Sequence, residues 1–88
     1  MYESRYSIKL VKKLKKLKKK NLKHYLFVRQ KMNEILENPH HKYKELRYSM
    51  KNINRIHLGH FVLVFTIDHI KKAVSFEDYD HHDKIYKK

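Results

Sequence analysis

The sequence predicts a single α+β domain, in which an N-terminal strand and a two-helix hairpin pack on one face of an antiparallel sheet of about four strands. The chain has 88 residues, which is the length of one small domain. It contains one Gly and one Pro, so we expect few loops and long regular elements. Apolar residues recur every two residues at the start, every three or four residues in the middle and every two residues again in the C-terminal half. The sequence contains no internal repeat.

The first predicted elements are a short strand and an amphipathic helix. Residues 6–10 alternate in character, which predicts a strand with Tyr6, Ile8 and Leu10 on one face. The period then lengthens, and this predicts a helix whose apolar residues are Leu10, Val11, Leu14 and Leu17. The rest of that helix is a lysine-rich run between residues 12 and 20.

A second helix follows and ends at a proline. Its apolar residues keep the helical period and are Leu22, Tyr25, Leu26, Val28, Met32, Ile35 and Leu36. Asn21 can end the first helix or cap the second. Asn38 and Pro39 stop the second helix, because proline cannot continue the hydrogen-bond ladder. The two helices therefore form a hairpin, with core positions predicted at Leu14, Leu17, Leu26 and Met32.

The C-terminal half predicts three strands. The polar segment 40–51 is expected to be a loop in which Tyr43, Leu46 and Tyr48 pack down. The strands that follow are Ile53–Leu58, Phe61–Ile67 and Lys72–Glu77. Short turns at residues 59–60 and 68–71 favour an antiparallel meander, with which the N-terminal strand must pair from across the sequence. The tail, residues 79–88, is polar and aromatic and is compatible with a short helix.

Alternation assigns a face to each residue of these strands. Ile56 and Leu58 lie on one side of the first strand, and Arg55 and His57 lie on the other. The core side is expected to carry Phe61, Leu63, Phe65, Ile67, Val74 and Phe76. On the opposite side, Val62 and Val64 have no obvious cover, which predicts a partner-binding patch there. The other interpretation is that the tail folds over these valines, and the two are compatible.

Charge narrows the possible partners. Twenty-two Lys and Arg against nine Asp and Glu give a net charge of +13, which attracts polyanions and repels copies of the chain. Nucleic acid is the first candidate, an anionic membrane surface the second and an acidic protein the third. The longest apolar run, Phe61–Phe65, is too short to span a bilayer.

The absence of cysteine excludes disulfides, a thiol nucleophile and Cys-ligated zinc. A cytoplasmic protein is therefore expected. The first ten residues carry charges at Glu3, Arg5 and Lys9 and no apolar stretch, so they are not expected to act as a signal peptide.

Residues 54–65, Asn-Arg-Ile-His-Leu-Gly-His-Phe-Val-Leu-Val-Phe, resemble the strand–turn–strand pattern Tyr-Arg-Ile-Arg-Val-Gly-Asp-Tyr-Arg-Val-Ile-Tyr of the RelE/ParE superfamily of toxins. The segments 7–17, 35–39 and 81–86 are also typical of that superfamily. The resemblance covers residues 6–87 and implies one RelE/ParE-like domain over residues 1–88. It further implies a metal-independent endoribonuclease that cleaves mRNA at the ribosome, needs no cofactor or membrane, and is held inactive by a cognate acidic antitoxin.

RNA cleavage without a metal requires removal of the 2′-hydroxyl proton, stabilisation of the phosphorane charge and protonation of the 5′-oxygen. Histidine suits the proton transfers, and Arg and Lys suit the phosphate. The resemblance assigns His82 as general acid or base, Arg55 as phosphate clamp, His57 as a second acid–base or phosphate contact, and Tyr86 as stacker or proton donor. His81 is a further catalytic candidate beside His82. Candidate RNA-binding residues are Lys13, Lys16, Lys20, Lys51, His60 and Lys84.

One departure from the pattern leaves two alternatives open. Val62 stands where the superfamily's most familiar catalytic Arg lies. The chain could therefore be a relative with weakened or lost catalysis that binds an antitoxin or nucleic acid, or a ParE-like inhibitor of DNA gyrase, although clustered histidines argue against the latter. His81, His82 and Asp83 could form a metal site, but adjacent histidines on a polar tail are more often solvated, so we predict no metal.

Overall fold

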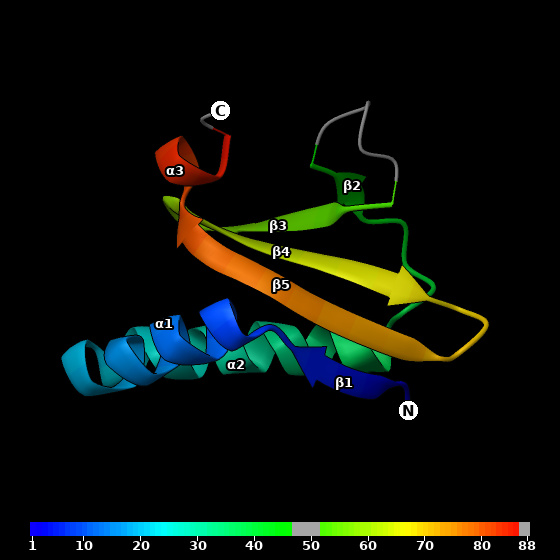
Figure 1. Ribbon diagram of the computed structural model, residues 1–88, viewed down its shortest axis with the longest axis horizontal. Coiled ribbons are helices and arrows are strands. Elements are labelled where there is room, and N and C mark those ends of the chain that lie inside the picture. The colour runs from blue at the N-terminus through cyan, green and yellow to red at the C-terminus, as the bar shows by residue number, and fades with distance from the viewer. Residues whose placement is uncertain (47–51, 87–88) are drawn as a thin grey trace.

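The computed structural model describes residues 1–46 and 52–86, which form an α+β domain (Figure 1). The order of its elements is β1 (Glu3–Tyr6), α1 (Ile8–Lys20), α2 (Leu22–Glu37), β2 (Lys44–Glu45), β3 (Asn54–Leu58), β4 (Phe61–Asp68), β5 (Ala73–His81) and α3 (His82–Tyr86). This confirms the predicted class. None of the helices in the described part of the chain is long and apolar enough to cross a membrane.

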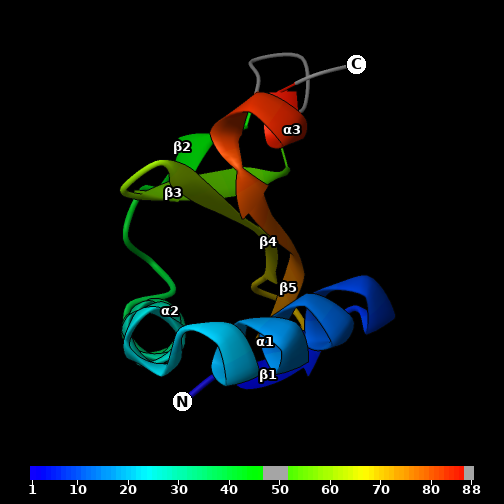
Figure 2. The same ribbon diagram turned by 90° about the vertical axis from the view of Figure 1, so that its left-hand side faces the viewer.

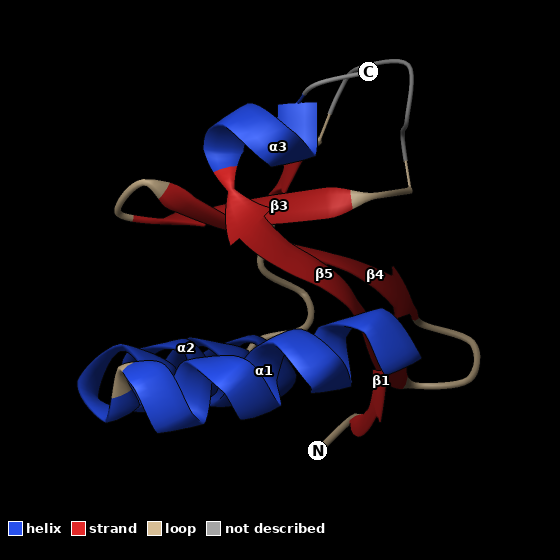
Figure 3. Ribbon diagram, turned by 60° about the vertical axis from the view of Figure 1, so that its left-hand side comes forward, coloured by secondary structure: helices blue, strands red, loops and turns tan. Residues whose placement is uncertain are grey.

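The sheet has five strands in the order β1-β5-β4-β3-β2. The meander β3-β4-β5 is antiparallel as predicted, and β2 pairs antiparallel with β3. β1 runs parallel to β5, so the sheet is mixed rather than fully antiparallel. Figure 3 shows the layers: α1 and α2 lie on one side of the sheet, and α3 lies on the other.

The predicted strand over residues 6–10 is wrong in its boundaries. The strand ends at Tyr6, and Ser7 caps α1 by accepting a 3.0 Å hydrogen bond on its hydroxyl oxygen from the Leu10 N–H. The Ser7 hydroxyl also donates to the Glu77 carbonyl at 2.6 Å, which ties the start of α1 to β5. Leu10 is therefore buried by the helix, whereas Ile8 is 77% exposed.

The helical hairpin turns at a single residue. The Asn21 N–H donates to the Leu17 carbonyl at 2.7 Å, and its side-chain oxygen accepts from the His24 N–H at 3.1 Å. Asn21 thus performs both of its predicted roles. The prediction that Leu26 is in the core is wrong, because its side chain is 56% exposed. The buried face of α2 is formed instead by Val28, Met32, Ile35 and Leu36.

The core lies between the helical hairpin and one face of the sheet. Its strand residues include Leu58, Leu63, Phe65, Val74 and Phe76, as alternation predicts. β5 is longer than predicted and continues through residues expected in the tail. Tyr79 is consequently a buried core residue, stacked on Phe61 at 5.2 Å between ring centroids. Its hydroxyl hydrogen-bonds with His24 of α2, and burial raises the pKa of Tyr79.

The face of β4 that carries Val62 and Val64 is covered in this structure, as expected if the tail folds over these valines. Val62 is completely buried and Val64 is 6% exposed. α3 contacts β4 and β5 from the side opposite α1 and α2 (Figure 2), and Ile85 of α3 lines a pocket together with Val64. The patch at Val62 and Val64 is therefore not an open surface, and a partner would reach it only if α3 moved away.

The polar segment after α2 contains the short strand β2 rather than only loop. Tyr43 packs its ring edge-on against Phe65 at 5.2 Å and donates its hydroxyl proton to the Asn38 carbonyl at 2.9 Å. Leu46 is half-buried, as expected, and its N–H donates to the Ile53 carbonyl at 2.7 Å. Tyr48 and Lys51 lie outside the described residues.

Replacement of Leu10 and of Ile8 by alanine should have very different effects. Leu10→Ala should lower the free energy of unfolding by about 2–5 kcal/mol, because it leaves a cavity beneath α1. Ile8→Ala should change it by less than about 0.5 kcal/mol, because that side chain is mostly in solvent. Urea denaturation of both variants is the measurement. Equal losses would mean that residues 6–10 form the strand that alternation predicts.

Candidate functional site

Arg55 and His57 lie side by side on the face of β3 that points away from α1 and α2. Ile56 between them packs on the core, so alternation forces its two neighbours outward. An Arg55 Nη1 group donates a 3.0 Å hydrogen bond to His57 Nδ1. The Arg55 Nε group donates to the Glu45 carbonyl at 3.1 Å. These two bonds fix the guanidinium against β2 and beside the imidazole.

α3 brings Tyr86 over this pair. The Arg55 guanidinium carbon lies 5.9 Å from the centre of the Tyr86 ring, within cation–π range. The His57 and Tyr86 rings are 6.4 Å apart between centroids and nearly parallel, at 27°. Three residues singled out from the sequence are therefore grouped in space, although β4 and β5 lie between Tyr86 and the other two along the chain.

The environment of His57 favours its neutral form. Partial desolvation, followed by the positive charges of Arg55, His82 and Lys44, lowers the pKa of His57 below the usual 6.5. Because Nδ1 accepts from Arg55, the neutral ring carries its proton on Nε2. His57 thus presents an N–H donor, which suits a bond to a phosphate oxygen.

His60, His81 and His82 gather where the β3–β4 turn meets the start of α3. The His82 N–H donates to the His60 carbonyl at 2.9 Å, which joins the two segments. The His81 and His82 ring centroids are 4.5 Å apart, and that of His60 lies 6.1 Å and 6.4 Å from them. Asp83 Oδ1 is 3.0 Å from His82 Nδ1, so its charge favours a proton on Nδ1 and leaves Nε2 as the basic nitrogen.

The same cluster holds the possible metal ligands. Among residues 1–46 and 52–86, the side chains that lie close enough together to share a metal ion are those of His81, His82 and Asp83. Their ligand atoms lie within 4.8 Å of one another. All three are at least partly exposed. The short contact of Asp83 with His82 also serves to orient that imidazole.

The predicted RNA-binding residues divide into several groups. Lys84 and His60 are exposed near Tyr86 and His82, on the α3 side of the sheet. Lys16 and Lys20 are exposed on α1, which lies across the sheet from α3 (Figure 2). Lys51 is not among the described residues.

Lys13 has an internal role. Its ammonium group bonds to Asp78 at 2.7 Å and to Asp80 at 2.8 Å, and Lys9 lies 3.3 Å from Asp78. Partial burial raises the pKa of both aspartates. The hydrogen bonds and charge of Lys13, with a backbone N–H bond to each carboxylate, outweigh this, so the pKa of each lies below the usual 3.8. For Lys13 the effects have the opposite sign. Burial lowers its pKa, but the two carboxylates outweigh this and raise the pKa above the usual 10.5.

Sequence reasoning missed Lys44, Glu45 and Asp83. Lys44 pairs with Arg55 across the β2–β3 ladder, and the Glu45 carbonyl holds the guanidinium. The two-residue strand β2 is too short to give an alternating pattern, so the sequence contains no signal for these contacts. Asp83 follows His82 directly and was noticed only as a possible metal ligand.

No model of a known protein family matches the chain. A protein of Methanocaldococcus jannaschii named "Putative toxin RelE4" is 48% identical over 89 aligned residues, which cover 100% of this chain and 94% of that protein. The chain belongs to the RelE family of toxins. An uncharacterized protein of Methanosarcina mazei is 49% identical over 98% of this chain and 100% of its own length.

A solved structure shows the same fold at low identity. The toxin in the intact Escherichia coli RelBE toxin–antitoxin complex superposes with a TM-score of 0.78 at 22% identity, over 92% of this chain and 96% of that one. The RelE-type fold therefore spans almost the whole domain, and the resemblance read from residues 54–65 is confirmed at the level of family and fold.

Replacing Lys13 by methionine should destabilise the protein by about 1–2 kcal/mol at neutral pH, because two partly buried carboxylates lose the ammonium group that bridges them and only Asp78 keeps a cation, Lys9, nearby. The lowered pKa of each aspartate means that this stabilisation is present above pH 3.8 and is lost as the pH falls through the lowered values. The difference between wild type and variant should therefore shrink in acid. Urea titrations across this range are the measurement, with Lys12→Met on the exposed side of α1 as the control.

Proposed function

We propose that this RelE-family protein is a toxin that cuts mRNA at the ribosome by using its own side chains as acid, base and phosphate ligand. The observation that carries this proposal is the grouping of Arg55, His57 and Tyr86 on an outward face, with His82 close enough to influence the pKa of His57. A structural protein has no evident need for such a group, because it concentrates positive charge and imidazoles where like charges repel.

The reaction moves one proton off the nucleophile and one onto the leaving group. The 2′-oxygen of the ribose forms a bond to phosphorus, and the bond from phosphorus to the 5′-oxygen breaks, leaving a 2′,3′-cyclic phosphate and a 5′-hydroxyl. His82 takes the 2′-proton on Nε2, since Asp83 favours a proton on Nδ1. His82 is close enough to His57 to influence the pKa of that imidazole, which supports assigning the base and the phosphate-binding groups to one site.

Arg55 and His57 stabilise the charge on the phosphorane. The guanidinium is held by the Glu45 carbonyl and by His57, so little entropy is lost when it meets the phosphate. The Nε2–H of neutral His57 adds a second donor. Tyr86 supplies a ring on which a base next to the cut can stack, and its hydroxyl group is the candidate proton donor to the 5′-oxygen.

The proposed partners are an acidic antitoxin and the ribosome with its mRNA. The E. coli relative was solved in a toxin–antitoxin complex, and a net charge of +13 favours both an acidic protein and RNA. A cytoplasmic location follows from these partners.

A second candidate is a RelE-family protein that binds RNA or antitoxin without cutting. The observation that favours it is the complete burial of Val62, at the position where the superfamily's familiar catalytic Arg is expected. The buried valine offers a phosphate neither a charge nor a hydrogen-bond donor. Catalysis would therefore depend on Arg55 and on the histidines of β3 and α3.

Replacing His82 by alanine should lower mRNA cleavage about a hundredfold or more, because the proposed base is removed. Asp83→Asn should give a smaller loss, because the imidazole remains but its preferred proton position is weakened. The measurement maps cuts in an mRNA translated in vitro. Gln30→Ala, exposed on α2, is the control and should cut like wild type.

Three outcomes separate the candidates. Cuts in wild type that disappear with His82 support the nuclease. Cuts of wild-type intensity in His82→Ala would refute the proposed base. An absence of cuts by wild type, with RNA binding retained, would favour the second candidate.

A further inference from the structure

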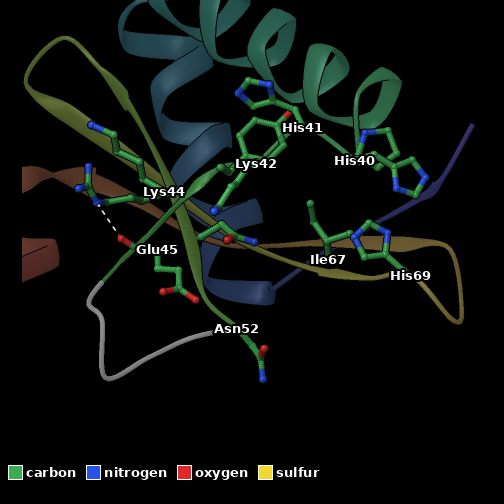
Figure 4. Close-up of a pocket in the computed structure, with 12 residues that line it drawn as sticks. His40, His41, Lys42, Lys44, Glu45, Asn52, Ile67 and His69 are labelled. Atoms are coloured by element: carbon green, nitrogen blue, oxygen red, sulfur yellow. Dashed lines mark hydrogen bonds between the residues drawn. The ribbon is translucent and has the colours of Figure 1, made fainter.

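An open pocket of about 840 Å³ begins at Arg55 and continues away from the site just described. Its walls come from the segment between α2 and β2, from the start of β3 and from the β4–β5 turn. Figure 4 shows Lys44 at one end of this pocket and His40 with His69 at the other, with Lys42 between them. We call the pocket the β2 groove.

The β2 groove is strongly basic. Lys42, Lys44 and Arg55 line it with fixed positive charges, against the single carboxylate of Glu45. His40, His41 and His69 add three imidazoles that can donate hydrogen bonds or carry further positive charge. A polyanion lying in the groove would meet cations along its length and would reach Arg55 at its end.

The far end of the groove is a built aromatic platform. The His40 and His69 rings are stacked 4.8 Å apart between centroids and are nearly parallel, at 10°. The Tyr2 hydroxyl lies 2.9 Å from His69 Nδ1 and 3.4 Å from His40 Nε2, so the residue just before β1 holds both rings in place. Both histidines remain exposed, which leaves flat faces on which a nucleobase can stack.

We propose that the β2 groove binds the single-stranded RNA that flanks the phosphate bound at Arg55, with Lys42 and Lys44 on its backbone and the His40–His69 pair against a base. The inference rests on the proposed function, because Arg55 belongs to both surfaces. Cations along a groove combined with a stacking platform are the features that bind single-stranded nucleic acid without sequence readout.

An acidic peptide is the rival occupant, and the groove fits it less well. Tight protein interfaces depend on apolar or aromatic anchors that fill pockets. The aromatic residue of this pocket, Tyr43, is already packed against Phe65 and bonded to the Asn38 carbonyl. The groove therefore offers charge and stacking rather than a socket for a side chain.

The test compares two fluorescein-labelled RNA oligonucleotides by anisotropy, each with a 2′-deoxy nucleotide that blocks cleavage. The short one spans only the phosphate at Arg55, and the long one adds flanking nucleotides on both sides. Lys42→Glu should weaken binding of the long RNA about tenfold, since a backbone contact becomes repulsive. His69→Ala should weaken it about fivefold through lost stacking. Neither variant should change binding of the short RNA.

Lys23→Glu is the matched control for charge, because Lys23 is exposed on α2 and lies outside the groove. Equal losses for Lys42→Glu and Lys23→Glu would overturn the proposal, since binding would then depend on total charge alone. Binding of polyglutamate that is lost in Lys42→Glu, while long RNA binds as before, would overturn it in favour of a peptide.

The outcome also separates the groove from the nuclease. If wild type cuts no mRNA but the groove variants lose affinity for the long RNA, the proposed reaction fails and the groove remains. If wild type cuts mRNA and His82→Ala does not, yet the groove variants bind the long RNA like wild type, the reaction stands and the groove proposal fails.

Discussion

The pairing of β5 with strands from both ends of the sequence is the constraint on which the rest of the structure depends. β5 lies between β1, with which it is parallel, and β4, with which it is antiparallel. Phe76 and Tyr79 on this strand contribute large buried rings to the core beneath the helical hairpin. The end of β5 then passes directly into α3. The same strand that closes the core therefore also carries His82 and Tyr86 to the opposite side of the sheet.

This arrangement separates two chemical environments across a single sheet. The side toward α1 and α2 is an apolar core with aromatic contacts. The other side carries Arg55, His57, His82 and Tyr86, with the buried valines of β4 beneath α3. Strand alternation makes this possible, because each core residue places its neighbours on the outer face. A stable interior and a crowded cationic site are thus built from the same strands.

The positive charges of the chain are paired with carboxylates in one part of the structure and left largely unpaired in another. Between α1 and β5, Asp78 and Asp80 neutralise the charge of Lys13, so this lysine stabilises the fold and is not available to bind a partner. Around His57, partial desolvation and the positive charges of Arg55 and Lys44 lower the pKa of the imidazole. Such uncompensated charge costs stability, and its retention is typical of surfaces that bind anions.

Much of the fold could be predicted because it depends on local spacing. The helical period placed Leu14 and Met32 in the core, and alternation placed Arg55 and His57 on the outer face. The predictions were wrong where the same spacing of apolar residues fits more than one structure. Tyr6 and Leu10 are four residues apart, an interval that fits a strand face and a helix face equally, and only the Ser7 cap decides between them. Leu26 fits the helical period as well, but lies on the flank of α2.

Residue types and spacing were therefore enough to predict the α+β class and the outward face of β3, and the resemblance of residues 54–65 to the RelE/ParE pattern predicted the family. The meeting of Tyr86 with Arg55, the bridge from Lys13 to the aspartates of β5 and the stacking of His40 on His69 were decided by the path of the chain. Each of these contacts joins residues about thirty or more positions apart. Local periodicity says which way a side chain points, whereas the partner it meets depends on how the elements pack in three dimensions.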